Sequence, residues 1–166
     1  MVESGVLAED APYELIDGEL VEMGPQGPLH AILVTRIRKR LEAAYPALHV
    51  REEKPITTDE FGLPEPDVAV SRGADADFLE RHPSGRDLLL AVEVAVTSGA
   101  VDQAKALPYS RAEIPVYWLV DIRERRILAH SDPRPTGYGL VSIVDEHGVV
   151  SLPGLDVAWT VASLLP

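Results

Sequence analysis

The sequence predicts an α/β or α+β domain built around a mixed β-sheet, and three observations lead to this prediction. Residues 88–96 form the most strand-like run and are apolar on both faces, as expected of a central strand covered on each side. Apolar residues at helical spacing span 29–45, and a second helix is expected over 102–112. Short strands around these segments give the order βαβββαββ, which suits a sheet flanked by helices.

Composition excludes several classes of protein. The 166 residues carry 15 Lys and Arg against 27 Asp and Glu, a net charge of −12. This charge argues against DNA binding unless positive charge is locally concentrated, and it suits a site that gathers carboxylates around a divalent cation. The absence of cysteine excludes disulfide scaffolds, thiolate zinc sites and cysteine nucleophiles.

The length predicts one domain over 13–166, preceded by a flexible acidic arm at 1–12. No apolar run approaches the roughly 20 residues of a membrane helix. The first residues also lack the basic start and apolar stretch of a secretory signal. We therefore expect a cytoplasmic protein with no membrane partner.

The N-terminal half contains a hairpin and a helix. Residues 13–23 predict a β-hairpin because Asp17-Gly18 favours a tight turn between strands. The helix over 29–45 ends at Pro46. Its apolar face consists of Leu33, Ile37, Leu41 and Ala44. Short strands are expected at 48–53 and 67–71.

The second half supplies the rest of the sheet. Residues 73–86 predict a surface loop or short helix before the strand at 88–96. One face of that strand should carry Leu88, Leu90, Val92, Val94 and Val96. The later strands are expected in two pairs, 116–121 with 126–130 and 138–144 with 149–152. Residues 153–166 form a short apolar tail.

Glu93 is the most informative candidate for chemistry. It lies in mid-strand between Ala91 and Ala95, where an unpaired carboxylate is costly to bury. It must have a cation, a hydrogen-bond partner or a metal ion, so it is either part of an ion-pair network or a metal ligand or acid–base group. Asp67, at the start of another strand, is by itself compatible with an ordinary turn residue. Together the two carboxylates can bind Mg²⁺, or Mn²⁺, through oxygen.

Four further residues have both a functional and a structural interpretation. Lys105 can hold an attacking water or steady negative charge, or it can be an exposed helix lysine paired with Asp102. Asp102 supports the site or simply starts the helix. His30 and Glu19 are supporting candidates, but His30 also fits a packed structural residue and Glu19 a strand-surface charge.

The basic residues bear on a nucleic-acid partner. The first helix concentrates positive charge off its apolar face, at Arg36, Arg38, Lys39 and Arg40. This patch can meet phosphates, or it can be a solvated helix face. Tyr109, Tyr117 and Trp118 are better interpreted as core or interface aromatics than as base-stacking residues. Glycine-rich phosphate loops, HExxH helices and GxSxG turns are missing from the sequence.

A series of motifs runs from residue 13 to the C-terminus. They are Tyr13-Glu14-Leu15-Ile16-Asp17-Gly18-Glu19-Leu20, His30 on a helix, Pro66-Asp67-Val68, Val92-Glu93-Val94, Asp102-x-x-Lys105-x-x-x-Tyr109 and Ile114-Pro115-Val116-Tyr117-Trp118-Leu119-Val120-Asp121. In order and spacing they resemble the Uma-two family of restriction-type endonucleases, a branch of the PD-(D/E)XK nuclease superfamily.

The resemblance implies a restriction-endonuclease-like core, with a mixed central sheet flanked by helices and an N-terminal hairpin. It also implies Mg²⁺-dependent hydrolysis of DNA phosphodiesters, with Asp67, Glu93 and the carbonyl of Val94 as metal ligands. The superfamily lysine should stand two residues after Glu93, where this chain has Ala95. By resemblance, Lys105 on the following helix takes its place.

Three functions remain open at this stage. The leading hypothesis is a metal-dependent endonuclease acting on DNA. The alternative from another class is a non-catalytic oligomeric or nucleic-acid-binding module that retains the fold, in which Glu93 would be tied to a cation of the protein. A hydrolase of small phosphate esters ranks last. A homodimer is the default assembly.

Overall fold

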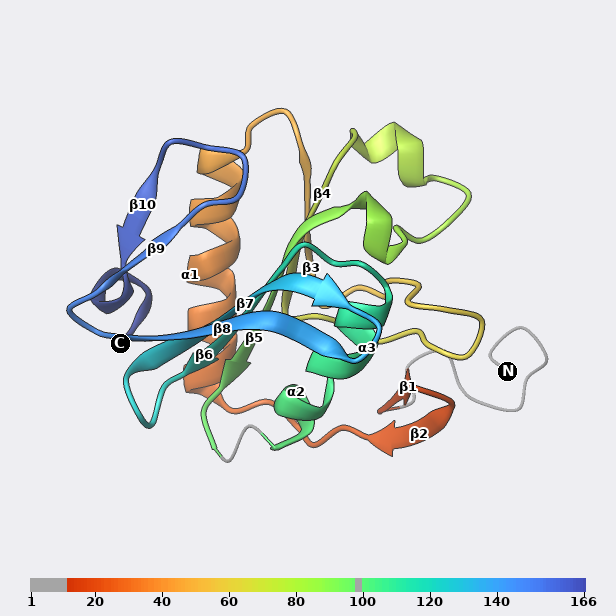
Figure 1. Cartoon of the computed structure of the whole chain (residues 1–166), viewed down its shortest axis with the longest axis horizontal. Coiled ribbons are helices and arrows are strands. Elements are labelled where there is room, and N and C mark those ends of the chain that lie inside the picture. Colours follow the sequence, from red (N-terminus) through yellow and green to blue (C-terminus); the bar gives the residue numbers. More distant parts are fainter. Residues whose placement is uncertain (1–11, 98–99) are drawn as a thin grey trace.

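A mixed six-stranded sheet forms the centre of the molecule in the computed structural model, which describes residues 12–97 and 100–166 (Figure 1). The strands, in their order across the sheet, are β3 (His49–Glu52), β4 (Val68–Ser71), β5 (Leu88–Ala95), β6 (Val116–Asp121), β7 (Arg126–Arg134) and β8 (Gly137–Asp145). Neighbours are antiparallel except β5 and β6, which are parallel. The predicted mixed sheet is confirmed.

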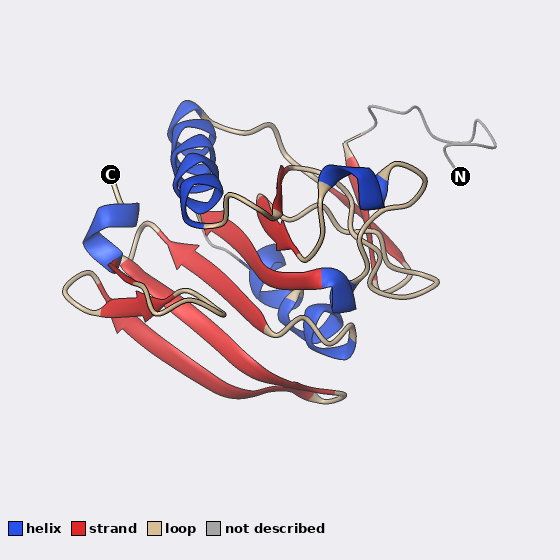
Figure 2. Ribbon diagram, turned by 90° about the horizontal axis from the view of Figure 1, so that it is seen from above, coloured by secondary structure: helices blue, strands red, loops and turns tan. Residues whose placement is uncertain are grey.

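Helices cover both faces of the sheet. The long helix α1 (Pro28–Ala44) buries the predicted stripe of Leu33, Ile37 and Leu41, together with Val34. This stripe packs in one cluster with alternate residues of the central strands, whereas the remaining residues of those strands pack with α3 (Ala106–Arg111). Successive strand residues point to opposite faces, so α1 and α3 lie on opposite sides of the sheet (Figure 2). The parallel strands β5 and β6 need a crossover connection between them, and α3 lies in that connection.

The predicted N-terminal hairpin is confirmed as β1 (Tyr13–Ile16) and β2 (Glu19–Glu22). Its turn residues Asp17 and Gly18 have φ angles of 50° and 85°, which suits the Asp-Gly pair. The hairpin stands apart from the main sheet. Backbone bonds from Gly18 N to Phe61 O (2.9 Å) and from Leu63 N to Leu15 O (2.8 Å) fix it to the loop before β4.

The predicted helix over 102–112 is interrupted. It forms two short helices, α2 (Ala100–Ala104) and α3, with Lys105 between them. Pro108 explains the break, because it has no N–H to donate to the carbonyl four residues earlier. This interruption places Lys105 at a helix junction rather than on a regular helix surface.

Two predictions about the sheet are wrong. β8 pairs with β7 and not with β9 (Val149–Ser151), which pairs with β10 (Ala158–Thr160) from the expected tail. Only two residues join β7 to β8, so β8 pairs with β7 in a hairpin rather than with β9. The register of β5 also shifts near Leu88, which therefore packs on the α3 side instead of with Leu90.

The polar segment 73–86 and the C-terminal end contain short 3₁₀ helices. They are η1 (Asp75–Phe78), η2 (Gly85–Asp87) and η3 (Val161–Leu164). The last buries Val161 and Leu164 against the α1 cluster, so the apolar tail completes this core. Across residues 12–97 and 100–166, none of the helices is long and apolar enough to cross a membrane. The single-domain boundary stays a prediction.

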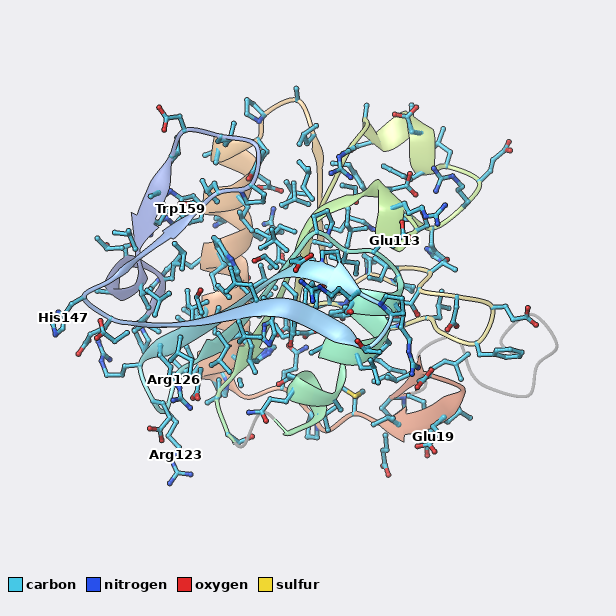
Figure 3. All side chains as sticks on the ribbon, in the orientation of Figure 1. Glu19, Glu113, Arg123, Arg126, His147 and Trp159 are labelled. Carbon is cyan, nitrogen blue, oxygen red and sulfur yellow. The ribbon has the colours of Figure 1, made fainter. Side chains whose placement is uncertain are left out.

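Much of the basic patch of α1 serves the fold. Arg36 donates to Leu165 O (3.0 Å), and Arg40 donates to Ser163 O (2.6 Å) while its guanidinium lies 4.5 Å from the ring centre of Trp159 (labelled in Figure 3). Arg38 pairs with Glu42 and Glu52. Of the four cations only Arg36 and Lys39 are exposed, and Arg38 and Arg40 are half-buried. The sequence led us to expect all four side chains on a solvated helix face, and only Arg36 and Lys39 are exposed in this way.

Replacing Arg40 with alanine should destabilise the protein by about 1–2 kcal/mol, because a charged hydrogen bond and a cation–π contact to the C-terminal segment are lost. Lys39→Ala, on the exposed side of the same helix turn, is the matched control and should change stability by less than about 0.5 kcal/mol. Urea unfolding followed by circular dichroism measures both. Equal effects of the two substitutions would contradict this role for Arg40.

Candidate metal and catalytic site

A cavity of about 620 Å³ opens where the hairpin, the start of α1, the ends of β4 and β5, and α2 meet. Its lining is strongly acidic. The carboxylates in it are those of Glu14, Glu53, Glu65, Asp67, Glu93 and Asp102. The basic groups in it are His30 and Lys105. Such an excess of carboxylates raises the local concentration of cations.

Glu93 is buried, with 2% of its surface exposed, and has the partners that its position demands. Its Oε1 accepts hydrogen bonds from Lys105 Nζ (3.0 Å) and from the hydroxyl of Tyr109 (2.7 Å). Among the described residues, the one hydrogen bond that its Oε2 accepts is a long one, 3.4 Å, from Asp67 N. Burial raises the pKa of Glu93 above its ordinary value, and the charge of Lys105 opposes this rise.

Lys105 is one of the most buried charged residues described, with 1% exposed, and is not the exposed helix lysine of the structural interpretation. Its Nζ lies 3.0 Å from Glu93 Oε1 and 2.9 Å from Glu14 Oε2. Burial lowers the pKa of Lys105, but the two carboxylates outweigh it and raise this pKa above the ordinary value. The ammonium is therefore charged and held from two sides.

Asp67 lies at the start of β4 and is 8% exposed. Its Oδ2 accepts from Val94 N (2.6 Å) and contacts His30 Nε2 (3.1 Å). The hydrogen bond to Asp67 raises the pKa of His30 above its ordinary value despite partial burial. The predicted neighbourhood of Asp67 and Glu93 thus exists, with Val94 beside both.

Donor atoms of His30, Glu53 and Asp67 all lie within 4.8 Å of one another, which is compatible with a shared metal ion. His30 Nδ1 is also buried with no hydrogen-bond partner among the described residues. Carboxylate oxygens suit Mg²⁺, and a mixed oxygen and imidazole set also suits Mn²⁺. The donor set therefore fits the divalent cation that the sequence predicts.

Three residues that contact the site or line it were not identified as site residues from the sequence. Glu14 shares the inward face of β1 with Ile16, so a carboxylate in the buried phase of a strand was a usable signal, as it was for Glu93. Tyr109 is fully buried, as expected of a core aromatic, but its hydroxyl also bonds Glu93. Glu53 follows β3 at a φ of 50°, and no sequence pattern indicates it.

The other predicted residues lie at different distances from this centre. Asp102 lines the cavity and is half-buried, and burial raises its pKa. Glu19 is exposed on β2, away from the main sheet (Figure 3), and is not among the lining residues. The cations of α1 are not among them either. Metal ligation by the carbonyl of Val94 stays a prediction.

Lys105→Met should cost about 3–5 kcal/mol of stability at neutral pH, because it leaves two buried carboxylates without their counter-charge. Without the lysine the pKa of Glu93 rises further, so the folded variant binds more protons than the unfolded chain. Stability of the variant should therefore increase as the pH falls from about 8 toward about 5.

Urea unfolding across this pH range tests the prediction. Lys39→Met, an exposed lysine of α1, is the control and should follow the wild type. A loss of stability in Lys105→Met that does not change with pH would show that the buried carboxylates are not its cause.

Comparison with solved structures finds the same fold in another protein. The crystal structure of a putative nuclease belonging to DUF820 from Anabaena variabilis ATCC 29413 superimposes with a TM-score of 0.75. The match covers 98% of this chain and 94% of that chain, at 16% sequence identity. At this identity the likeness establishes a shared fold. No curated protein matches the chain.

The comparison with protein families agrees with the motifs. The Uma2 family, described as "Putative restriction endonuclease", matches residues 4–164. This range contains the hairpin, the Asp67 and Glu93 strands and the Lys105 junction. The resemblance inferred from the motifs is therefore confirmed, and the chain belongs to the Uma2 family of restriction-endonuclease-like proteins.

Proposed function

We propose that this protein is a divalent-metal-dependent nuclease that hydrolyses DNA phosphodiester bonds. The convergence of Asp67, Glu93 and buried Lys105 in one acidic cavity carries the proposal. Membership of a nuclease-like family supports it. Asp67 immediately precedes β4, Glu93 lies on β5 and Lys105 lies at the α2–α3 junction, so the fold itself brings them together.

Asp67 and Glu93 would hold the metal ion, Mg²⁺ or Mn²⁺, with the carbonyl of Val94 and with His30 and Glu53 beside them. A bound divalent cation supplies Lewis acidity and lowers the pKa of a coordinated water. The cluster of His30, Glu53 and Asp67 donor atoms supports the part of Asp67, and the contact of Glu93 Oε2 with Asp67 N (3.4 Å) supports that of Glu93. Magnesium is the first choice because most of the donors are carboxylates.

The chain's own groups then have distinct tasks. Val94 N–H fixes the Asp67 carboxylate, and the Tyr109 hydroxyl fixes that of Glu93. The Lys105 ammonium is a fixed positive charge beside Glu93, suited to orient a water or to stabilise negative charge on a phosphate. Asp102 adds a further half-buried carboxylate at the cavity wall.

Binding of DNA must overcome the net charge of −12. A bound cation offsets part of the negative charge of the cavity, and exposed cations such as Lys39 can contact phosphates. Arg38 and Arg40 are already engaged within the protein. We therefore propose a modest electrostatic contribution to DNA affinity. The homodimer and the cytoplasmic location also stay predictions.

A non-catalytic module that retains the nuclease fold is the second candidate, and one observation favours it. Glu93 Oε1 is tied to Lys105, a cation of the protein, and to Tyr109. This arrangement satisfies the buried carboxylate without any metal ion. Within residues 12–97 and 100–166, however, Glu93 Oε2 accepts only the long bond from Asp67 N, which leaves this oxygen available to a cation.

Asp67→Asn and Glu93→Gln should each bind Mg²⁺ more weakly and lose at least about 100-fold in metal-dependent cleavage of plasmid DNA, since each removes a proposed metal ligand. Isothermal titration and a gel assay measure the two effects. Glu19→Gln removes an exposed carboxylate that is not among the cavity-lining residues, and it should behave as the wild type.

Cleavage that survives in both Asp67→Asn and Glu93→Gln would refute this site. A wild type that neither binds metal nor cleaves DNA would favour the non-catalytic module.

Lys39→Ala should flatten the dependence of log affinity for DNA on log salt by about 0.9, the slope of one phosphate contact. Fluorescence anisotropy with a labelled duplex at several salt concentrations measures this slope. Arg123→Ala, an exposed cation on the β6–β7 turn (Figure 3), should leave it unchanged. An unchanged slope in Lys39→Ala would remove this residue from the proposed DNA contacts.

A further inference from the structure

Glu14 is an unusual residue for its location. The β1–β2 hairpin stands outside the main sheet, and most of its residues are exposed or half-buried. Glu14 is 7% exposed, whereas Tyr13 beside it is 43% exposed. A buried carboxylate is costly unless charge and hydrogen bonds compensate it, so its partners indicate what it does.

Those partners belong to the catalytic centre. Glu14 Oε2 accepts from Lys105 Nζ (2.9 Å) and from the backbone N–H of Glu65 (3.1 Å). Glu65 lies two positions before Asp67, so Glu14 contacts both the lysine and the segment that leads into the metal-binding strand. The hairpin thereby delivers one charged group to the interior of the site.

The role of Glu14 follows from the number of carboxylates that contact the Lys105 ammonium. With a single carboxylate partner, the Lys105 ammonium would neutralise Glu93, leaving a pair with no net charge. With Glu14 present, one ammonium is shared between two carboxylates, so this group of three carries one net negative charge when both carboxylates are ionised. Lys105 and Tyr109 occupy Oε1 of Glu93, and Oε2 remains on the side of Asp67.

We propose that Glu14 is a positioning residue for the cation site: by sharing the Lys105 ammonium, it leaves Glu93 with a net negative charge and an available oxygen for a divalent cation. This inference rests on the metal site of the proposed function. It assigns to the N-terminal hairpin a direct part in cation affinity.

A general effect of negative charge on cation binding must be separated from this role, and Glu65 permits the separation. Glu65 lines the same cavity and is half-buried. Among the described residues no ion pair joins it to Lys105. Glu65→Gln therefore removes one negative charge from the cavity without changing the partners of the lysine.

Titration of Mn²⁺ into wild type, Glu14→Gln and Glu65→Gln tests the proposal, with circular dichroism to confirm folding. Affinity should fall by about tenfold or more in Glu14→Gln and by about two- to threefold in Glu65→Gln, because only the first returns the whole ammonium charge to Glu93. In a Lys105→Met background, Glu14→Gln should change the affinity no more than Glu65→Gln does.

Equal losses in Glu14→Gln and Glu65→Gln would overturn the proposal, as would a wild type that binds no Mn²⁺. A large loss in Glu14→Gln that persists without Lys105 would also overturn it, by showing that Glu14 acts on the ion directly. If the Lys105→Met background does not fold, the comparison of the two single variants decides. A wild type that binds Mn²⁺ but does not cleave DNA would refute the proposed nuclease function. The Mn²⁺ affinities of Glu14→Gln and Glu65→Gln would then still test the role of Glu14.

Discussion

The buried ammonium of Lys105 is the interaction on which the site depends. It lies between Glu93 on the central strand and Glu14 on the N-terminal hairpin, at 3.0 and 2.9 Å. A charge with 1% exposure is stable only if both contacts persist. The lysine therefore joins three parts of the chain by charge: the sheet, the hairpin and the α2–α3 junction.

The sequence was informative where a residue violated a local pattern. Glu93 in an apolar strand was identifiable for this reason. Asp67 fits an ordinary turn residue and became a candidate only together with Glu93. Lys105 had a functional and a structural interpretation, and the family resemblance gave it the place of the missing superfamily lysine. Glu53 violates no pattern, since only the fold brings it near His30 and Asp67. The β8–β9 pairing was wrong because alternation of residues identifies a strand without naming its partner. The partner was set by the short β7–β8 turn, and β10 was hidden in an apolar tail.

The negative net charge of the chain is concentrated in part at the cavity. Six carboxylates line one cavity that holds one lysine and one histidine, while several arginines of α1 bind the C-terminal segment and nearby glutamates. Positive charge thus stabilises the fold, and negative charge collects at the site. A cation bound there would relieve repulsion among carboxylates that folding has forced together, so metal binding and conformational stability are expected to be coupled.

The order of the site's elements along the chain, with the hairpin before β5 and α3, also bears on synthesis. Glu14 emerges from the ribosome before Lys105 and Tyr109, and the parallel β5–β6 pair cannot form until the segment between its strands, which contains α2 and α3, has been synthesised. A nascent chain that ends before α3 has no complete charge cluster, and a fragment that begins after β2 lacks Glu14. The full set of groups thus exists only in a chain that extends from the hairpin through α3.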